Sequence, residues 1–308
     1  YRQLIIDRVD PVAIAWVIPC PATERSGEVN DRYTFLLYVP EPCRCPEDSP
    51  NRPEAIRERV RRVYSSCRNL CEDVHDIVIL DRIPASVTAE ITIEGPDPAE
   101  SVLARLLFEL GNFLAPEPRR RSFRTLLDEG RSKEEIFRGV SVANGFFDPS
   151  ELRPKDGEIR VQDLLRVLTG DPAVRAVRDI AVRVGETGTV HGVNATIGVA
   201  AEQILQLDAR ATASGELTGL RLIRHGRAVR VDSQRVEREL SRLWAAHRRL
   251  YPVAAELGEE TPRGTYRELD EYYSLQNQFP KVYGIGPYGV PPDASKARLG
   301  QARQLKGY

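Results

Sequence analysis

The sequence predicts an α+β fold with a mixed core, and three observations lead to this expectation. Residues 87–93 alternate apolar and polar side chains, as a half-buried strand does, and an apolar helical stripe follows at residues 102–110. Residues 161–168 repeat the helical spacing, and residues 180–184 repeat the strand spacing. The first fifty residues hold further alternating runs. We expect the two strand–helix units to share one sheet, with their helices packed on one face.

The N-terminal region, residues 1–50, is expected to be rich in strands. Apolar side chains alternate from Val12 to Ile18, and residues 33–39 form a second run. Turn-forming residues between the two runs predict a hairpin with a long connection. The proline-rich stretch 40–53 marks the first predicted domain boundary.

The α/β core is expected to span residues 51–190. It begins with an amphipathic helix from Glu54 to Cys71 and continues with the strand and helix at 87–110. Ser132 and Glu135 have the spacing of a capping box. The helix at 161–168 is stopped by Gly170, Asp171 and Pro172, and the strand at 180–184 follows it.

The remaining chain is expected to form a small β-rich part with a helix, residues 191–251, and an extended aromatic arm, residues 252–308. Residues 221–231 predict a two-stranded piece around His225 and Gly226. Asp232 or Ser233 can cap an amphipathic helix that reaches Tyr251. Its predicted apolar face consists of Val236, Leu240, Leu243, Trp244, His247, Leu250 and Tyr251.

The composition argues against two kinds of partner. The chain has 44 Lys and Arg residues against 45 Asp and Glu, so its net charge is −1, which disfavours bulk binding of nucleic acid. No run approaches the roughly 18 apolar residues that a membrane helix needs, and no signal-peptide pattern opens the chain. Methionine is absent, even at position 1, so we expect an ordered portion of a chain that continues at both ends.

The cysteines offer a weak metal hypothesis. Their number, five, is odd, which together with the lack of a signal peptide argues against a secreted disulfide framework. Four thiolates could bind zinc, but neither spacing is the usual C-x2-C, so buried or incidental thiols are favoured. Two of the four are expected on the core face of the helix 54–71. The candidate ligands are Cys43, Cys45, Cys67 and Cys71.

No pattern points to catalysis or to a cofactor. Gly284, Gly286 and Gly289 match the letters of a dinucleotide fingerprint, but the prolines that follow cannot open the required helix. Ser66 lies in no nucleophile elbow, and the adjacent pairs Glu134–Glu135 and Glu259–Glu260 are expected to be solvated. The histidines fall in no metal-binding arrangement: His75, His191, His225 and His247. We therefore expect no enzyme activity and no cofactor.

Two groups of residues are candidate interfaces. The first is a basic run, and the favoured interpretation is that it forms a solvated surface. The second interpretation is a salt bridge to a neighbouring subunit, and the third is binding of nucleic acid. The run consists of Arg119, Arg120, Arg121 and Arg124. The second is aromatic, lies in a stretch rich in proline and glycine, and is expected to dock on another subunit or a distant domain rather than pack on the 232–251 helix. Its members are Tyr266, Tyr272, Tyr273, Phe279, Tyr283 and Tyr288.

Four strings together resemble the baseplate J-like proteins of contractile phage tails and related contractile injection systems. The strings are VTAEITIEGPDPAESVLARLLFELGNFLAP at 87–116, LLDEGRSKEEIFRG with GFFDPSEL at 126–152, IRVQDLLRVLTGDPAVRAVRDIAV at 159–182 and RELDEYYSLQNQFPKVYGIG at 267–286. The resemblance spans about residues 67–308 and is weaker within 185–230. It rests on the order of the strings and not on one diagnostic motif.

The resemblance implies an architectural protein without catalytic residues. Its expected role is that of a baseplate wedge component, which couples the opening of the baseplate to contraction of the sheath. We expect it to assemble in the cytoplasm into a sixfold, phage tail-like particle, without insertion into a membrane. The implied partners are a second copy or a related larger wedge protein, the hub and spike, and the sheath or tube initiator. A phage tail and an injection system both remain open, and a free-standing ligand-binding or enzymatic α/β protein is the alternative from another class.

Overall fold

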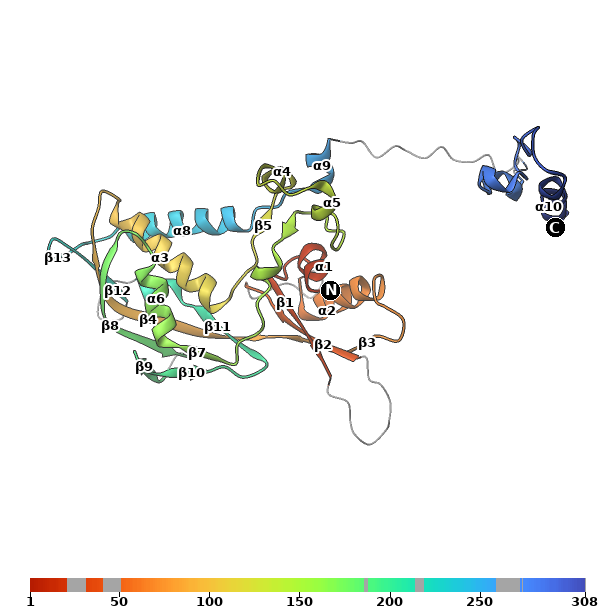
Figure 1. Cartoon of the computed structure of the whole chain (residues 1–308). Helices are drawn as coiled ribbons and strands as arrows, with labels where there is room; N and C mark the ends of the chain where they lie inside the picture. The colour runs from red at the N-terminus through yellow and green to blue at the C-terminus, as the bar shows by residue number, and fades with distance from the viewer. Residues whose placement is uncertain are drawn as a thin grey trace. The chain divides into compact units, whose positions relative to one another are not determined.

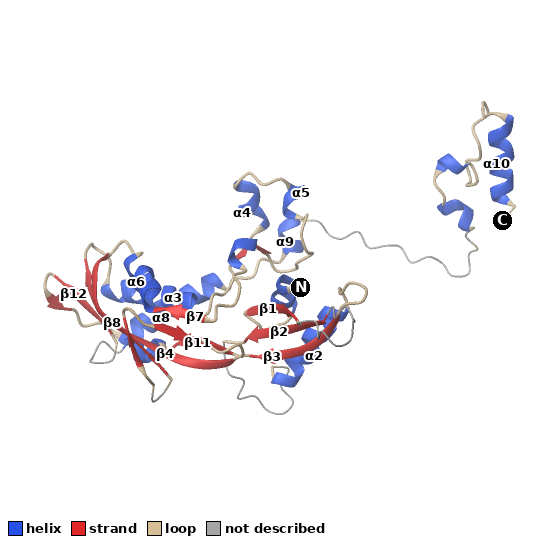
Figure 2. Cartoon of the chain, turned by 60° about the horizontal axis from the view of Figure 1, so that its bottom comes forward, coloured by secondary structure: helices blue, strands red, loops and turns tan. Residues whose placement is uncertain are grey.

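The computed structural model describes residues 1–20, 32–40, 51–185, 188–213, 219–258, 272 and 274–307. The chain divides into two compact units, Tyr1–Glu259 and Glu260–Tyr308. Helices mix with open sheets of parallel and antiparallel strands, so the predicted α+β class is confirmed (Figures 1 and 2).

A three-stranded sheet opens the first unit. Its order is β1-β2-β3, in which β1 and β2 form the predicted antiparallel hairpin and β3 runs parallel to β2. Strand β3 was not predicted because charged residues interrupt its apolar alternation, and helix α1 was not predicted because it is short. The sheet takes strands from both sides of the predicted boundary at residue 50. The elements are α1 (Arg2–Arg8), β1 (Ile14–Pro19), β2 (Arg32–Tyr38), α2 (Pro53–Ser65) and β3 (Asp73–Ile79).

Helix α2 is shorter than predicted, and the expectation for two cysteines on its core face was wrong. The helix ends at Ser65, so its buried face holds only Ile56, Val60 and Tyr64. Cys67 lies just beyond the end, where its thiol donates to the Val63 carbonyl at 3.2 Å. Cys71 is exposed and has a left-handed backbone, with φ of 69°.

The second sheet has six strands and contains both predicted strand–helix units. Its order is β13-β12-β4-β8-β9, and β11 pairs with the first half of β4. Strands β11 and β12 run parallel to β4, whereas β8 runs antiparallel. Strand β8 begins earlier than the predicted residue 180, because Val174 and Ala176 already pair with β4. The strands are β4 (Asp81–Ile93), β8 (Val174–Val184), β9 (Val190–Gly192), β11 (Gln203–Leu207), β12 (Leu220–Arg224) and β13 (Arg227–Ala228).

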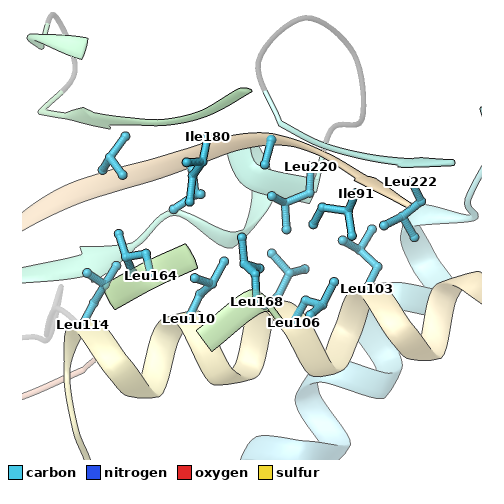
Figure 3. Close-up of a cluster of buried hydrophobic side chains, with 14 of the residues drawn as sticks. Ile91, Leu103, Leu106, Leu110, Leu114, Leu164, Leu168, Ile180, Leu220 and Leu222 are labelled. Carbon is cyan, nitrogen blue, oxygen red and sulfur yellow. The ribbon is translucent and has the colours of Figure 1, made fainter. Parts of the chain in front are cut away.

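Helices cover one face of this sheet and bury its apolar side chains (Figure 3). Every second residue of β4 from Ala85 to Ile93 is buried against the stripe of α3, which includes the fully buried Leu106 and Leu110. Helix α8 ends at His247, so Leu250 leaves the predicted apolar face and is 53% exposed. The helices are α3 (Ala99–Leu114), α6 (Val161–Thr169) and α8 (Ser233–His247).

Short elements complete the two units. The predicted capping box of Ser132 and Glu135 is present at the start of α5. In the first unit these elements are β5 (Arg120–Arg121), α4 (Phe123–Asp128), α5 (Lys133–Ile136), β6 (Phe146–Phe147), η1 (Pro149–Glu151), β7 (Glu158–Arg160), β10 (Thr196–Gly198), α7 (Ala209–Ala213) and α9 (Val253–Leu257). The second unit holds η2 (Leu275–Gln278), η3 (Lys281–Tyr283) and α10 (Lys296–Lys306).

Arg105 of α3 joins the two strand–helix units at one end of the sheet. Its guanidinium donates to both carboxylate oxygens of Asp171 at 2.7 and 3.2 Å and lies 3.0 Å from Asp97. Asp171 follows α6, and its side chain is 7% exposed. Burial alone would raise the pKa of Asp171, but the hydrogen bonds from Arg105 and the Ala173 amide, with the Arg105 charge, lower it.

Replacing Arg105 by alanine is expected to lower the free energy of unfolding at pH 7 by about 2 kcal/mol. Because the folded-state pKa of Asp171 is depressed, its contribution is present above the unfolded-state pKa of about 3.9 and is lost as the pH falls through the folded-state value. Urea unfolding at pH 7 and at pH 2.5 should therefore give a smaller difference from the wild type at the lower pH.

The matched control is Arg166→Ala, which removes an exposed ion pair with Asp163 on the neighbouring helix. Its effect should stay within about 0.5 kcal/mol at both pH values. An Arg105→Ala effect of the same size at pH 7 and pH 2.5 would contradict the assignment to Asp171.

Candidate assembly surfaces

The two sheets of the first unit meet at a junction that is apolar in its centre. A buried cluster occupies it and takes side chains from both sheets and from the end of α3. Trp16 of β1 lies in this cluster at 5% exposure, and its indole nitrogen donates to the Arg153 carbonyl at 3.1 Å. The cluster consists of Ile14, Trp16, Leu36, Tyr38, Leu80, Ala115 and Ile204.

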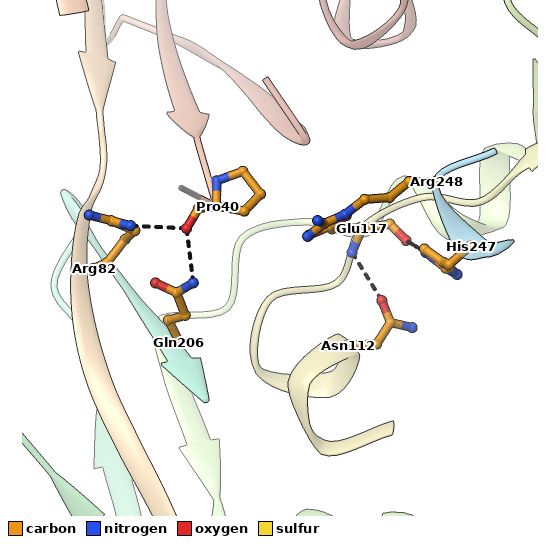
Figure 4. Close-up of polar contacts among 7 residues, drawn as sticks. All are labelled: Pro40, Arg82, Asn112, Glu117, Gln206, His247 and Arg248. Atoms are coloured by element: carbon orange, nitrogen blue, oxygen red, sulfur yellow. Dashed lines mark hydrogen bonds and ion pairs between the residues drawn. The ribbon is translucent and has the colours of Figure 1, made fainter. Parts of the chain in front are cut away.

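Two groups of polar contacts lie at this junction (Figure 4). The carbonyl of Pro40, just after β2, accepts from Arg82 of β4 at 2.9 Å and from Gln206 of β11 at 3.0 Å. One carbonyl thus links the end of the small sheet to two strands of the large sheet. This contact fixes the direction in which β2 leaves the junction.

Glu117 carries the second polar contact of the junction. Its side chain is 5% exposed, and its two oxygens accept from Arg248 at 2.7 Å each. The Glu117 amide donates to the side-chain oxygen of Asn112 at 3.2 Å, and its carbonyl accepts from Nε2 of His247 at 2.9 Å (Figure 4). Arg248 also lies over the Trp244 ring, 4.7 Å from its centroid. The end of α8 is therefore held at the segment after α3.

Burial at the same place affects Tyr38 of β2. Burial raises the pKa of its hydroxyl well above the ordinary value, and the Glu117 carboxylate adds to this shift. Tyr38 therefore stays neutral at physiological pH, and its ring serves the packing of the junction. The arrangement supplies rigidity, since apolar contacts and the hydrogen bonds of Pro40 hold both sheets together.

The predicted arginine run is divided between internal and external roles. Arg120 donates to the Ile6 carbonyl at 2.9 Å and lies over the Phe147 ring, while Arg121 pairs with Glu129. Arg119 and Arg124 have exposed side chains. The four residues are neighbours in sequence, but only Arg119 and Arg124 among them keep their charges available at the surface.

The predicted aromatic group lies in the second unit. Tyr266 and Tyr273 fall outside the described residues. Phe279 and Tyr283 touch edge to face, with ring centroids 5.8 Å apart, and the Lys281 ammonium lies 4.5 Å from the Tyr288 centroid. The large apolar or aromatic side chains that this unit exposes are Tyr272 (91%), Leu275 (67%), Phe279 (42%), Val282 (65%), Tyr283 (45%), Tyr288 (78%), Leu299 (39%) and Leu305 (44%).

The interior of the second unit is very small. Among its described residues, the buried ones are Gly284, Ile285 and Ala302. A unit of this length with so few buried side chains has little hydrophobic stabilisation of its own. Many exposed apolar side chains on so small a unit are typical of a protein-binding surface.

The described residues that were considered for chemistry form no metal-binding cluster. Cys43 and Cys45 lie outside the described residues, Cys20, Cys67 and Cys71 are free thiols, and the described residues contain no cluster of three metal-binding side chains. His247 contacts the Glu117 carbonyl, and Glu135 belongs to the capping box. The loop of Gly284, Gly286 and Gly289 is followed by a further loop, and α10 begins only at Lys296.

The cavity at the junction of β1, α3 and β7 holds about 340 Å³. Its charged lining mixes signs: Lys155 and Arg160 face it together with Asp156, Glu158 and Asp163. Burial lowers the pKa of Lys155, but its ammonium donates to the Ala200 carbonyl at 3.0 Å.

The described helices include none that is long and apolar enough to cross a membrane.

Comparison with known proteins gives a likeness in structure alone. No family model and no curated protein matches the sequence. A solved baseplate chain shares the fold. It belongs to the cryo-EM structure of the anti-feeding prophage baseplate, sixfold symmetrised, and matches 99% of this chain with a TM-score of 0.54 and 16% identity. The match covers 53% of that chain, so this chain corresponds to about half of its length.

The polar contacts of the junction were not predicted from the sequence. Glu117 stands alone in a proline-flanked segment, and Arg248 follows a helix already rich in arginine. No local pattern distinguishes this pair from solvated charges, and the two residues lie 131 positions apart. The one signal was the predicted apolar helical face, which reached Tyr251 and included Trp244 and His247 near the end of α8.

Proposed function

We propose that this chain is a structural subunit of a baseplate in a phage tail-like particle. The observation that carries the proposal is the likeness to the anti-feeding prophage baseplate chain along 99% of the sequence. The rigid junction and the mixed α+β core suit a part that bears load. The exposed apolar side chains of the second unit suit a part that binds neighbours.

The finer role that we propose is that of a J-like wedge component of a contractile injection system. In this role the chain assembles with other wedge subunits around a hub and spike and couples the opening of the baseplate to contraction of the sheath. The order of the four sequence strings supports this role. The proposed partners are a second copy or a larger wedge protein, the hub or spike, and the sheath or tube initiator.

We further propose that the aromatic side chains of the second unit make one of these contacts. Tyr272 and Tyr288 are almost fully exposed, so they contribute little to the stability of the unit that carries them. Tyrosine is enriched among the residues that dominate binding energy at interfaces. Arg119 and Arg124 are the members of the basic run that can reach a neighbouring subunit.

Electron microscopy of particles from co-expressed neighbouring genes tests this function. We expect sheathed tubes with a sixfold end plate, and a tag on this chain should label that plate. The variant Tyr272→Ala/Tyr288→Ala should enter particles at least about tenfold less, since central aromatic residues contribute 2 kcal/mol or more each. Leu70→Ala is the matched control, because Leu70 is 94% exposed on the first unit.

Two outcomes would contradict the proposal. A monodisperse monomer that forms no particle with its neighbours would argue for a free-standing protein. Normal incorporation of the double tyrosine variant would leave the baseplate role intact and remove the aromatic contact from it.

A further inference from the structure

The face of the six-stranded sheet that points away from the helices is ordered in rows across the strands. Strand register places Arg178, Glu90 and Arg221 side by side on β8, β4 and β12. Arg183 lies beside Ser86 two rows away. Side chains on this face alternate with the buried ones of Figure 3, so they point to the opposite side of the sheet. We call the surface of Arg178, Arg183, Arg221 and Glu90 the arginine face.

The arginine face carries excess positive charge. The side chains of Arg178, Arg183 and Arg221 are exposed, against one carboxylate. Arg221 lies 3.9 Å from Glu90, with exposures of 59% and 33%, which is a weak surface pair. The side chains of Arg178 and Arg183 make no hydrogen bond or ion pair with the part of the chain that the structure describes. Because the whole chain has a net charge of −1, this excess is local.

The rows beside the central arginines hold mostly small side chains. The row between the charged ones holds Thr88, Ala181 and Gly192, and the row beyond Glu90 holds Thr92 and Ala176 with the larger Ile223 at its β12 end. The threonine, alanine and glycine positions let another backbone approach the sheet closely. Arg178 and Arg221 lie two strand spacings apart, about 10 Å. Seven residues of an α-helix span about the same distance.

We propose that the arginine face binds an acidic helix of another subunit in the particle. Carboxylates two turns apart on that helix pair with Arg178 and Arg221, whose planar guanidinium groups bind carboxylates through two hydrogen bonds. The helix itself lies on the rows of threonine, alanine and glycine. This inference rests on the proposed function, because the helix belongs to a neighbouring baseplate protein.

A protein surface fits this face better than nucleic acid does. Single strands bind to grooves where aromatic rings stack on bases, and the rows of the arginine face contain no aromatic side chain. Glu90 stands between the two central arginines, where it would repel a phosphate backbone. A helix, in contrast, can place one hydrogen-bond donor against Glu90 and carboxylates on either side of it.

The test compares two double variants in the full chain, co-expressed with its neighbouring genes. Arg178→Glu/Arg221→Glu reverses the charge of the arginine face. The control, Arg166→Glu/Arg210→Glu, reverses two charges on the helical side of the sheet, where the Arg166 and Arg210 side chains are 82% and 91% exposed. We expect the first variant to enter particles at least about tenfold less than the wild type and the second to enter normally. Thermal unfolding of both purified chains checks that they fold equally well.

A photo-crosslinking residue in place of Thr88 identifies the partner. The proposal requires a crosslink to an acidic helical segment of a particle protein. Equal incorporation of both charge-reversed variants overturns this proposal without contradicting the baseplate function. A crosslink to a second copy of this chain has the same two consequences. Tight binding of a labelled 20-base-pair DNA duplex that the first variant abolishes also overturns it. Absence of the wild-type chain from particles overturns both proposals.

Discussion

Replacing Arg248 by alanine is expected to lower the free energy of unfolding by about 3 kcal/mol, because it leaves a buried carboxylate without its counter-ion. Glu117 is 5% exposed and receives both of its side-chain hydrogen bonds from Arg248, at 2.7 Å each. The substitution also removes the guanidinium from the Trp244 ring. Urea unfolding of the purified chain, followed by circular dichroism, measures the loss.

A second substitution separates the charge effect from lost packing. In the double variant Glu117→Gln/Arg248→Ala the buried group is neutral, so the double variant should be more stable than Arg248→Ala alone. The control is Arg210→Ala, which removes a pair exposed at 91% and 65% and should cost less than about 0.5 kcal/mol. If the added Glu117→Gln change destabilises the chain further, the loss comes from packing and not from an unpaired carboxylate.

Replacing Leu106 by alanine is expected to cost about 3 kcal/mol, within the usual range for a buried leucine. Its side chain is fully buried between α3 and the strands of the large sheet (Figure 3). The substitution removes apolar contacts and leaves a cavity, since neighbouring side chains relax only in part. Chemical denaturation should show a lower midpoint with an unchanged dependence on urea concentration.

Two variants on the same helix control for changes in helix stability. Leu106→Met conserves volume and should cost less than about 1.5 kcal/mol, while Glu109→Ala alters an exposed position and should stay within about 0.5 kcal/mol. Equal losses for Leu106→Ala and Glu109→Ala would mean that α3 does not bury Leu106 as the structure describes.

Local patterns predicted the elements of the large sheet well. The alternation at 87–93 became the second half of β4, and the spacing from Val161 to Leu168 became α6, which ends before Gly170. Ser132 and Glu135 formed their capping box. The failures also have local causes. The apolar spacing continued past the ends of α2 and α8, although Leu250 is 53% exposed.

Local sequence patterns predicted most of the longer helices and strands, although not α1 and β3, because periodicity, caps and turn residues act between positions a few residues apart. The pairing of strands, in contrast, is known only from the tertiary structure. Residues 203–207 and 220–224 carry no sign that both run parallel to β4, and the same holds for the meeting of Glu117 with Arg248. Such contacts depend on the closure of long loops and on the burial of both partners, which a local pattern does not encode.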